Sequence, residues 1–228
     1  MQTYSALLIG ASGLVGSHLV KILLDHPQIH KVTILVRKPI GINHPKLEEK
    51  IIDFNELEQF EKAMGTGDFI FSCIGTTMKK VKGDKHLYRQ IDFDIPVNGA
   101  RFGAKAGYKK FMLVSAHLAN SKSRIFYSRL KGETDEIVST FPFQAIHIFR
   151  PSFLIGERKE KRWIELTLGK LMERIAAILP GNYKPIQAKT VAEAMLSAAL
   201  SNQKGTHIYH YQEMNQLIRK LSFSPDNQ

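Results

Sequence analysis

A tyrosine and a lysine four residues apart, Tyr127 and Lys131, are spaced for proton-transfer chemistry. Positions i and i+4 share one helix face, so the phenol and the ammonium project together. A nearby ammonium favours the phenolate, which predicts that the pKa of Tyr127 is lowered toward neutrality. Such a phenol can exchange a proton with a carbonyl or alcohol oxygen. Ser115, twelve residues earlier and at the end of an apolar run, is the candidate third member of this catalytic group.

Three glycines near the amino end form a second chemical motif. They follow the apolar run Ala6 to Ile9 and lead into a helical pattern that begins at Leu14. In a dinucleotide site the first glycine allows a tight turn, the second admits the pyrophosphate, and the third lets helix and strand pack closely. The helix amino terminus then offers N–H groups to the phosphates. The alternative is an ordinary glycine-rich turn. The candidate contacts are Gly10, Ser12, Gly13, Leu14, Val15 and Gly16.

Apolar runs and helical patterns alternate along the chain, which predicts an α/β fold. The runs are almost continuously apolar, as expected of strands buried on both faces of a parallel sheet. With the glycine motif after the first run, the prediction is a doubly wound Rossmann fold. The predicted strands are Ala6–Ile9, Val32–Val36, Ile51–Phe54, Phe69–Ile74, Phe111–Ser115, Phe143–Phe149 and His207–Tyr211. The predicted helices are Leu14–Leu24, Glu56–Met64, Leu87–Ala106, Arg124–Val138, Trp163–Leu179 and Val191–Leu200.

Ligands of such sheets bind beyond the carboxyl ends of the strands, so the residues that follow each apolar run are the candidate ligand contacts. Arg37 and Lys38 follow the second run, where a base accommodates the 2′-phosphate of NADP. The alternative for both is a pair of solvated surface bases. Asp53 and Phe54 follow the third run. There an acid can reach the adenine amino group, or it can cap a helix that starts near Asn55.

The fourth run ends in Cys73 and is followed by Gly75, Thr76 and Thr77. A glycine followed by hydroxyls lets the backbone pass close to a cofactor. Cys73 is interpreted as a small buried residue in preference to a nucleophile, because no helix amino terminus is placed to lower its thiol pKa. Pro151 fixes the exit of the sixth run, where it lines the nicotinamide in this architecture.

The chain has 228 residues, a single cysteine and a net charge of +11. One cysteine allows no internal disulfide, and no signal peptide or membrane span is apparent, so we expect a cytoplasmic protein. The basic clusters lack the interleaved aromatic residues of single-strand binders, so no nucleic-acid partner is expected. They are interpreted as solvated faces or as groups that attract an anionic ligand. The clusters are Lys79, Lys80, Lys82 and Lys85, and Arg158, Lys159, Lys161 and Arg162.

The chain is predicted to form one domain over residues 1–221, with a small substrate-side insertion at 151–185 and a frayed tail at 222–228. The helical pattern Trp163–Leu179 carries an apolar stripe. This stripe is expected to cover a substrate pocket or to pack on the sheet. A homodimer contact or a membrane-surface contact is the alternative.

The motifs together resemble the short-chain dehydrogenase/reductase superfamily, through the glycine triplet, Tyr127-x-x-x-Lys131 and Arg150-Pro151. Over roughly residues 4–201 the sequence looks most like the atypical members related to the Tat-interacting protein. That similarity lies in Ile-Gly-Ala-Ser-Gly (9–13), Val-Thr-Ile-Leu-Val-Arg (32–37), Asp53-Phe54, Cys-Ile-Gly-Thr-Thr (73–77), Val-Ser115 and Phe-Arg-Pro (149–151). The resemblance implies NADP binding through Gly10, Ser12, Gly13, Arg37, Asp53 and Thr76, and a Tyr127/Lys131 pair.

Two positions depart from the superfamily pattern. The catalytic serine of these enzymes often lies one or two positions later than Ser115, where this chain has Ala116 and His117. Asp92 stands where many relatives carry an asparagine.

Three functions therefore stay open: an NADP-dependent oxidoreductase acting on a small carbonyl or alcohol substrate, an NADPH-sensing protein without turnover, and a nucleotide-sugar epimerase or dehydratase. Fewer than eighty residues follow Arg150, which leaves little material for a large sugar pocket.

Overall fold

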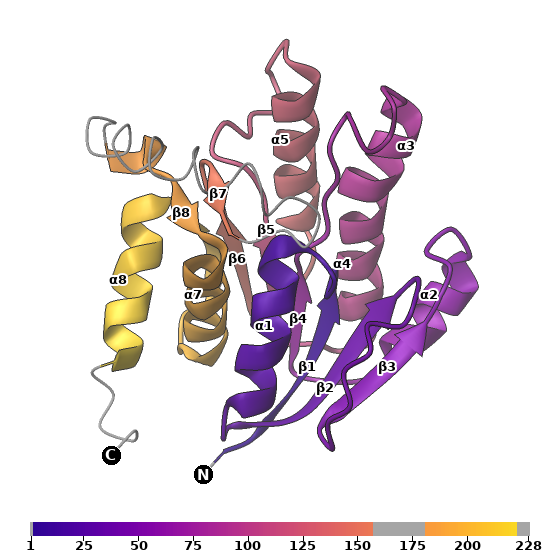
Figure 1. The fold of residues 1–228 in the computed structure, drawn as a ribbon, viewed down its shortest axis with the longest axis vertical. Helices are drawn as coiled ribbons and strands as arrows, with labels where there is room; N and C mark the ends of the chain where they lie inside the picture. The colour runs from indigo at the N-terminus through magenta and orange to yellow at the C-terminus, as the bar shows by residue number, and fades with distance from the viewer. Residues whose placement is uncertain (1, 157–180, 223–228) are drawn as a thin grey trace.

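The computed structural model describes residues 2–156 and 181–222, and Figure 1 shows their arrangement. Nine strands are present in these ranges: β1 (Tyr4–Ile9), β2 (Ile29–Val36), β3 (Leu47–Ile51), β4 (Phe69–Ser72), β5 (Lys110–Val114), β6 (Ala145–Phe149), β7 (Leu154–Ile155), β8 (Ile186–Gln187) and β9 (Gly205–Tyr209). Seven of them form one parallel sheet in the order β3-β2-β1-β4-β5-β6-β9. The predicted doubly wound Rossmann fold is confirmed. The strand order reverses between β1 and β4, which is where such sheets bind their ligands.

Helices cover both faces of this sheet (Figure 1). On one face lie α1 (Leu14–Asp25), α7 (Ala188–Leu200) and α8 (Tyr211–Ser222). On the other lie α2 (Leu57–Met64), α4 (Ile95–Lys105) and α5 (Phe126–Val138). A short helix α3 (Lys85–Arg89) and a π-helical turn (Gln90–Asp94) run directly into α4, and a 3₁₀ turn spans Gly181–Tyr183. A separate two-stranded sheet pairs β7 with β8.

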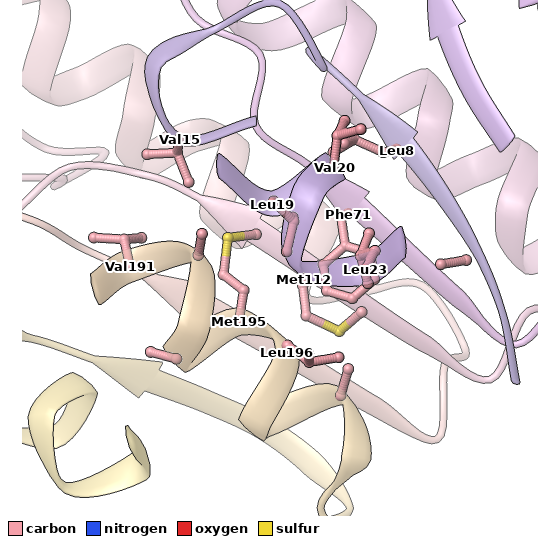
Figure 2. Close-up of a cluster of buried hydrophobic side chains, with 14 of the residues drawn as sticks. Leu8, Val15, Leu19, Val20, Leu23, Phe71, Met112, Val191, Met195 and Leu196 are labelled. Carbon is pink, nitrogen blue, oxygen red and sulfur yellow. The ribbon is translucent and has the colours of Figure 1, made fainter. Parts of the chain in front are cut away.

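The two faces have separate cores that hold the helices against the sheet. Figure 2 shows the core between α1 and α7, where Leu19 and Leu23 meet Met195 over Phe71 and Met112. All five of these side chains are almost completely buried. Truncating a buried leucine in such a core costs about 2–5 kcal/mol, so these contacts fix the start of α1 beneath the glycine loop.

Two predicted elements are wrong in position or type. The strand expected at Ile51–Phe54 ends at Ile51 and occupies Leu47–Ile51. It is an edge strand with the polar sequence Leu-Glu-Glu-Lys-Ile, so it lacks the apolar run that marks a buried strand. Tyr211, expected as the end of the last strand, begins helix α8, which extends to Ser222, the first residue of the expected tail. The helix expected at 163–179 and the basic cluster at 158–162 lie outside the described residues, as does most of the expected insertion.

A buried histidine in β6 makes the stability of the fold depend on pH. His147 is fully buried, and its Nδ1 lies 2.9 Å from the hydroxyl of Tyr209 in the neighbouring strand β9. Burial, and then the nearby charges of His207 and Lys110, lower the pKa of His147 to about 3. The unfolded chain binds a proton at this residue below about pH 6.5, whereas the folded chain does not. Stability is therefore lost as the pH falls below that value.

As the pH drops below 6.5, we expect this residue to lower the free energy of unfolding with a slope that begins at about half of its limit and approaches about 1.4 kcal/mol per pH unit near pH 5. His147→Gln should remove that component because an amide does not titrate. Urea unfolding at several pH values would measure the slope. His30→Gln, at an exposed position, should keep the wild-type slope. An unchanged slope in His147→Gln would contradict the assignment.

Candidate functional site

The glycine loop between β1 and α1 is held by its own close packing. Gly10 has φ +89°, and a Cβ there would lie 2.7 Å from the backbone of Cys73. A Cβ on Gly16 would lie 2.1 Å from the Gly10 carbonyl oxygen. These two glycines are therefore required by the fold itself. Gly13 is different, because its φ of −75° is open to any residue and its nearest neighbour to a Cβ would be the Gly10 oxygen at 3.2 Å.

The amino terminus of α1 points its backbone donors at the space above this loop. Gly13 precedes the helix without a side-chain cap, and no acidic residue lies in the first turn. The first N–H groups of a helix have no intrahelical acceptor, so an anion is favoured there. Ser12 is exposed and Leu14 half-buried, whereas Val15 is buried in the core. Val15 can therefore contact a ligand through its backbone only.

Arg37 and Lys38 follow β2 as expected and are exposed. Neither side chain makes an ion pair or a hydrogen bond with any residue that the structure describes. Asp53 is also exposed, and its Oδ1 accepts hydrogen bonds from the Asn55 backbone N–H and Nδ2, both at 2.9 Å. Helix α2 is preceded by Glu56 rather than Asp53, so the helix-capping alternative for Asp53 is wrong.

Of the remaining predicted contacts near β3 and β4, one side chain belongs to the core and the others lie in the loop that follows β4. Phe54 is buried against Phe60, with ring centroids 5.0 Å apart, so its side chain belongs to the core. The Thr77 hydroxyl accepts a hydrogen bond from the Lys80 N–H at 3.3 Å. Gly75 is exposed, and the backbone of Thr76 is anchored within the protein. Four lysines of this loop are exposed, in keeping with a solvated face: Lys79, Lys80, Lys82 and Lys85.

Cys73 is a packing residue. Its sulfur lies 3.8 Å from the Met195 sulfur, and burial raises the pKa of its thiol well above the ordinary value. A thiol held in this way is a weak nucleophile at neutral pH. Cys73 is half-buried rather than fully buried, and its packing supports the expected preference over a nucleophile.

Tyr127 and Lys131 lie on α5, one turn apart, with a buried carboxylate behind them. Lys131 is only 6 % exposed, and its Nζ lies 2.8 Å from Oδ1 of Asp92. The Tyr127 ring is 42 % exposed and packs edge-on against Tyr88. The structure thus brings the predicted pair together at one end of the sheet, above the ends of β4 and β5.

The pKa of Tyr127 does not follow the prediction. It is raised above its ordinary value, primarily because of desolvation. The ammonium of Lys131 acts in the expected direction, but Asp92 and Asp135 oppose it. The prediction of a phenol tuned toward neutrality is wrong primarily because desolvation of the phenol outweighs the effect of Lys131, and the two carboxylates add to the rise in pKa. Tyr127 is therefore protonated at neutral pH.

Ser115 lies at the base of the site rather than at its surface. It is 6 % exposed, and its hydroxyl makes no hydrogen bond within the described residues, although it is close enough to the Asp135 carboxylate to oppose the rise in pKa that desolvation causes there. Arg150 donates a hydrogen bond from Nε to Asp135 Oδ2 at 2.9 Å, and its Nη2 lies 2.9 Å from the same oxygen. Pro151 is buried, and its carbonyl oxygen accepts from the His117 N–H at 3.0 Å. Asp135 was missed from the sequence, although its i+4 spacing from Lys131 was a readable signal.

Two histidines meet where β5 and β9 end. Nδ1 of His117 lies 3.3 Å from Nδ1 of His210, and the His117 ring packs edge-on against Tyr183 with centroids 4.6 Å apart. Burial and the neighbouring His117 lower the pKa of His210. His117 stands two positions after Ser115, so this pair lies at the same edge of the sheet as the predicted site. His210 carried no signal in the sequence, because the following residues were expected to continue a strand.

Comparison with known proteins agrees with this geometry. The family model described as NAD(P)H-binding matches residues 10–140, more than half of the chain. The chain belongs to this NAD(P)H-binding family. The rat protein HTATIP2 is 29 % identical over 208 residues, which cover 90 % of this chain and 85 % of that protein. The mitochondrial protein FMP52 of Candida albicans is 30 % identical over 209 residues, covering 88 % and 89 %. The expected resemblance to the Tat-interacting-protein group is confirmed.

Solved structures show the same fold in more distant proteins. The UDP-N-acetylglucosamine 4-epimerase of Methanobrevibacter ruminantium M1 superposes with a TM-score of 0.69 at 19 % identity, covering 97 % of this chain and 82 % of that one. At this identity the likeness establishes the fold.

The expectation of a cytoplasmic protein is contradicted by these relatives. Several fungal proteins that match most of the chain are named mitochondrial. The expectation rested on one cysteine and on features of the amino end, and more than one reducing compartment holds proteins with few cysteines. Within residues 2–156 and 181–222, no helix is both long and apolar enough to cross a membrane.

Gly13→Val should weaken NADPH binding at least about tenfold while leaving the fold intact. The φ of −75° at Gly13 suits any residue, and the added Cβ at 3.2 Å from the Gly10 oxygen requires a shift of only a few tenths of an ångström. We expect the added side chain to obstruct the phosphates that this loop is predicted to hold. Isothermal titration calorimetry would measure the affinity, and circular dichroism the fold. Gly16→Ala is the contrasting variant and should impair folding, because its Cβ collides with the Gly10 oxygen. Wild-type affinity in folded Gly13→Val would show that this loop does not hold the phosphates.

Proposed function

We propose that this protein is an NADP-dependent oxidoreductase of the atypical short-chain dehydrogenase type, acting on a small carbonyl or alcohol substrate. The observation that carries the proposal is the Tyr127–Lys131 pair, with its ammonium 2.8 Å from Asp92, next to the loop that follows β4. This pair lies on the same edge of the sheet as the glycine loop after β1. A nucleotide held over the switch point would present its nicotinamide end to the phenol.

The residues present fit a dinucleotide. The helix amino terminus after Gly13 has free first-turn donors and no capping side chain, as a pyrophosphate requires. The position of Gly13 lacks the Cβ that would occupy the approach. Arg37 and Lys38 are exposed without partners among the described residues, which suits the 2′-phosphate of NADP. Asp53 keeps one carboxylate oxygen without a hydrogen bond in the described residues and is proposed to face the adenine.

The side chains of the site have separate roles in this proposal. NADPH, when bound, supplies the hydride. Tyr127 gives its proton to the substrate oxygen, and its raised pKa keeps that proton in place at neutral pH, which favours the reduction of a carbonyl. Lys131 holds the nicotinamide ribose and offsets negative charge that develops on the phenol. Ser115 is set back against Asp135 and contributes less directly.

An NADPH-sensing role without turnover is the second candidate. Ser115 is turned toward Asp135, and Ala116, with no hydroxyl, stands at the next position. The usual place beside the substrate oxygen therefore has one polar group fewer than in an active enzyme of this type. Both candidates require the cofactor site and differ only in chemistry.

Calorimetric titration of the wild-type protein with NADPH and NADH tests the part that the two candidates share. We expect NADPH to bind more tightly, because a 2′-phosphate gains charge-assisted hydrogen bonds from the bases after β2. Absence of binding by either nucleotide would contradict both candidates. Tight NADPH binding without reduction of any aldehyde or ketone would favour the sensing role.

A further inference from the structure

Asp92 is a buried carboxylate that connects two parts of the proposed site. It lies in the π-helical turn Gln90–Asp94 between α3 and α4 and is 1 % exposed. Single π-turns inside α-helices occur frequently at functional sites, because the extra residue redirects a side chain. The groups that face Asp92 are the ammonium of Lys131, the phenols of Tyr88 and Tyr127, and the backbone of Thr76.

The two oxygens of Asp92 have different partners. Oδ1 pairs with Lys131 Nζ at 2.8 Å, and Oδ2 accepts a hydrogen bond from the Thr76 N–H at 2.7 Å. The Thr134 hydroxyl also donates to the Asp92 carbonyl oxygen at 3.3 Å, which adds a second connection to α5. One side chain thus links the helix that carries Tyr127 and Lys131 to the loop that follows β4.

Lys131 depends on this carboxylate for its charge. Burial alone disfavours an ammonium and lowers the pKa of a lysine. Asp92 reverses that effect for Lys131, with smaller help from Tyr127 and Asp135, so the lysine pKa is raised. Asp135 has a smaller effect on Lys131 than Asp92 has, and its Oδ2 is paired with the Arg150 guanidinium at 2.9 Å.

We propose that Asp92 is a positioning residue that keeps Lys131 an ammonium and fixes it relative to the Thr76 loop. The proposal rests on the proposed function for what Lys131 does, and on the structure for how Lys131 is held. An asparagine at this position could accept from only one of the two partners through its oxygen, since its amide nitrogen would face the Lys131 or Thr76 donor. The aspartate therefore serves both contacts at once.

The test measures the titration of Lys131 in the protein without cofactor or substrate. NMR of protein labelled with ¹³C at the lysine Cε follows the protonation of each amine, and Lys131→Met assigns the signal. In Asp92→Asn we expect the pKa of Lys131 to fall by about one pH unit or more, because desolvation then acts without its main opponent. Asp94→Asn is the matched control. It makes the same charge change in the same turn, at a half-buried residue without an ion pair in the described chain.

An unchanged Lys131 titration in folded Asp92→Asn would overturn the proposal. If that variant does not fold, the wild type decides the question. Its Lys131 should remain an ammonium beyond the ordinary lysine pKa of 10.5, and titration below that value would contradict the proposed role of Asp92. Because neither measurement contains NADPH or a substrate, its outcome is independent of whether the protein is an oxidoreductase.

Discussion

Tyr127→Phe should reduce NADPH-dependent carbonyl reduction by about 10²–10⁴-fold and leave NADPH affinity close to that of the wild type. The substitution keeps the ring and its edge-on packing against Tyr88 but deletes the proton that the mechanism requires. Steady-state NADPH oxidation measures the rate, and calorimetry the affinity. Tyr4→Phe is the matched control, because it deletes the same hydroxyl at the opposite end of the sheet, where β1 begins.

Two neighbouring substitutions separate the roles within the site. Lys131→Ala should reduce both turnover and NADPH affinity, because the ammonium is proposed to serve the ribose and the phenol. Ser115→Ala should cost less than Tyr127→Phe, since the serine hydroxyl faces Asp135. Turnover of Tyr127→Phe at the wild-type rate would show that this phenol is not the proton donor.

Arg37→Ala should remove most of the preference for NADPH over NADH. A charge-assisted hydrogen bond contributes roughly 1.5–3 kcal/mol, which corresponds to a ~10–100-fold difference in affinity. Arg37 is exposed and has no partner among the described residues, so the substitution should not disturb the fold. Paired titrations with the two nucleotides give the ratio directly. Arg101→Ala, at an exposed position on α4, should keep the wild-type ratio, and a preserved ratio in Arg37→Ala would contradict its role.

The parts of the fold that the sequence predicts correctly are those with strong local signals. The glycine loop is one example, because its three glycines follow an apolar run directly; Gly16 is required by a contact six residues away, and Gly10 by the backbone of Cys73 after the spatially neighbouring strand β4. The long helix patterns are another. The edge strand β3 could not be placed from an apolar pattern, since its three central residues are charged. Helix α8 was missed because its buried residues, Met214 and Leu217, form only a short stripe.

The candidate site shows the same division between local and tertiary signals. The spacing of Tyr127 and Lys131 on one helix predicts their proximity. The pKa of Tyr127 is raised first by desolvation and then by Asp92, which lies in the π-helical turn, and by Asp135, which is held by Arg150 after β6. Such contacts form only after the sheet assembles. Sequence spacing alone therefore identifies Lys131 as a partner of the phenol and misses the two carboxylates.

The most direct test of the account is hydride transfer itself. The wild-type protein would be incubated with NADPH deuterated at the transferable nicotinamide position and with a panel of small aldehydes and ketones. Mass spectrometry would then examine the alcohols formed. We predict deuterium on the former carbonyl carbon of at least one product, formed with wild-type protein and lost to about 1 % or less with Tyr127→Phe. Tight NADPH binding with no labelled alcohol from any member of the panel would contradict the oxidoreductase assignment.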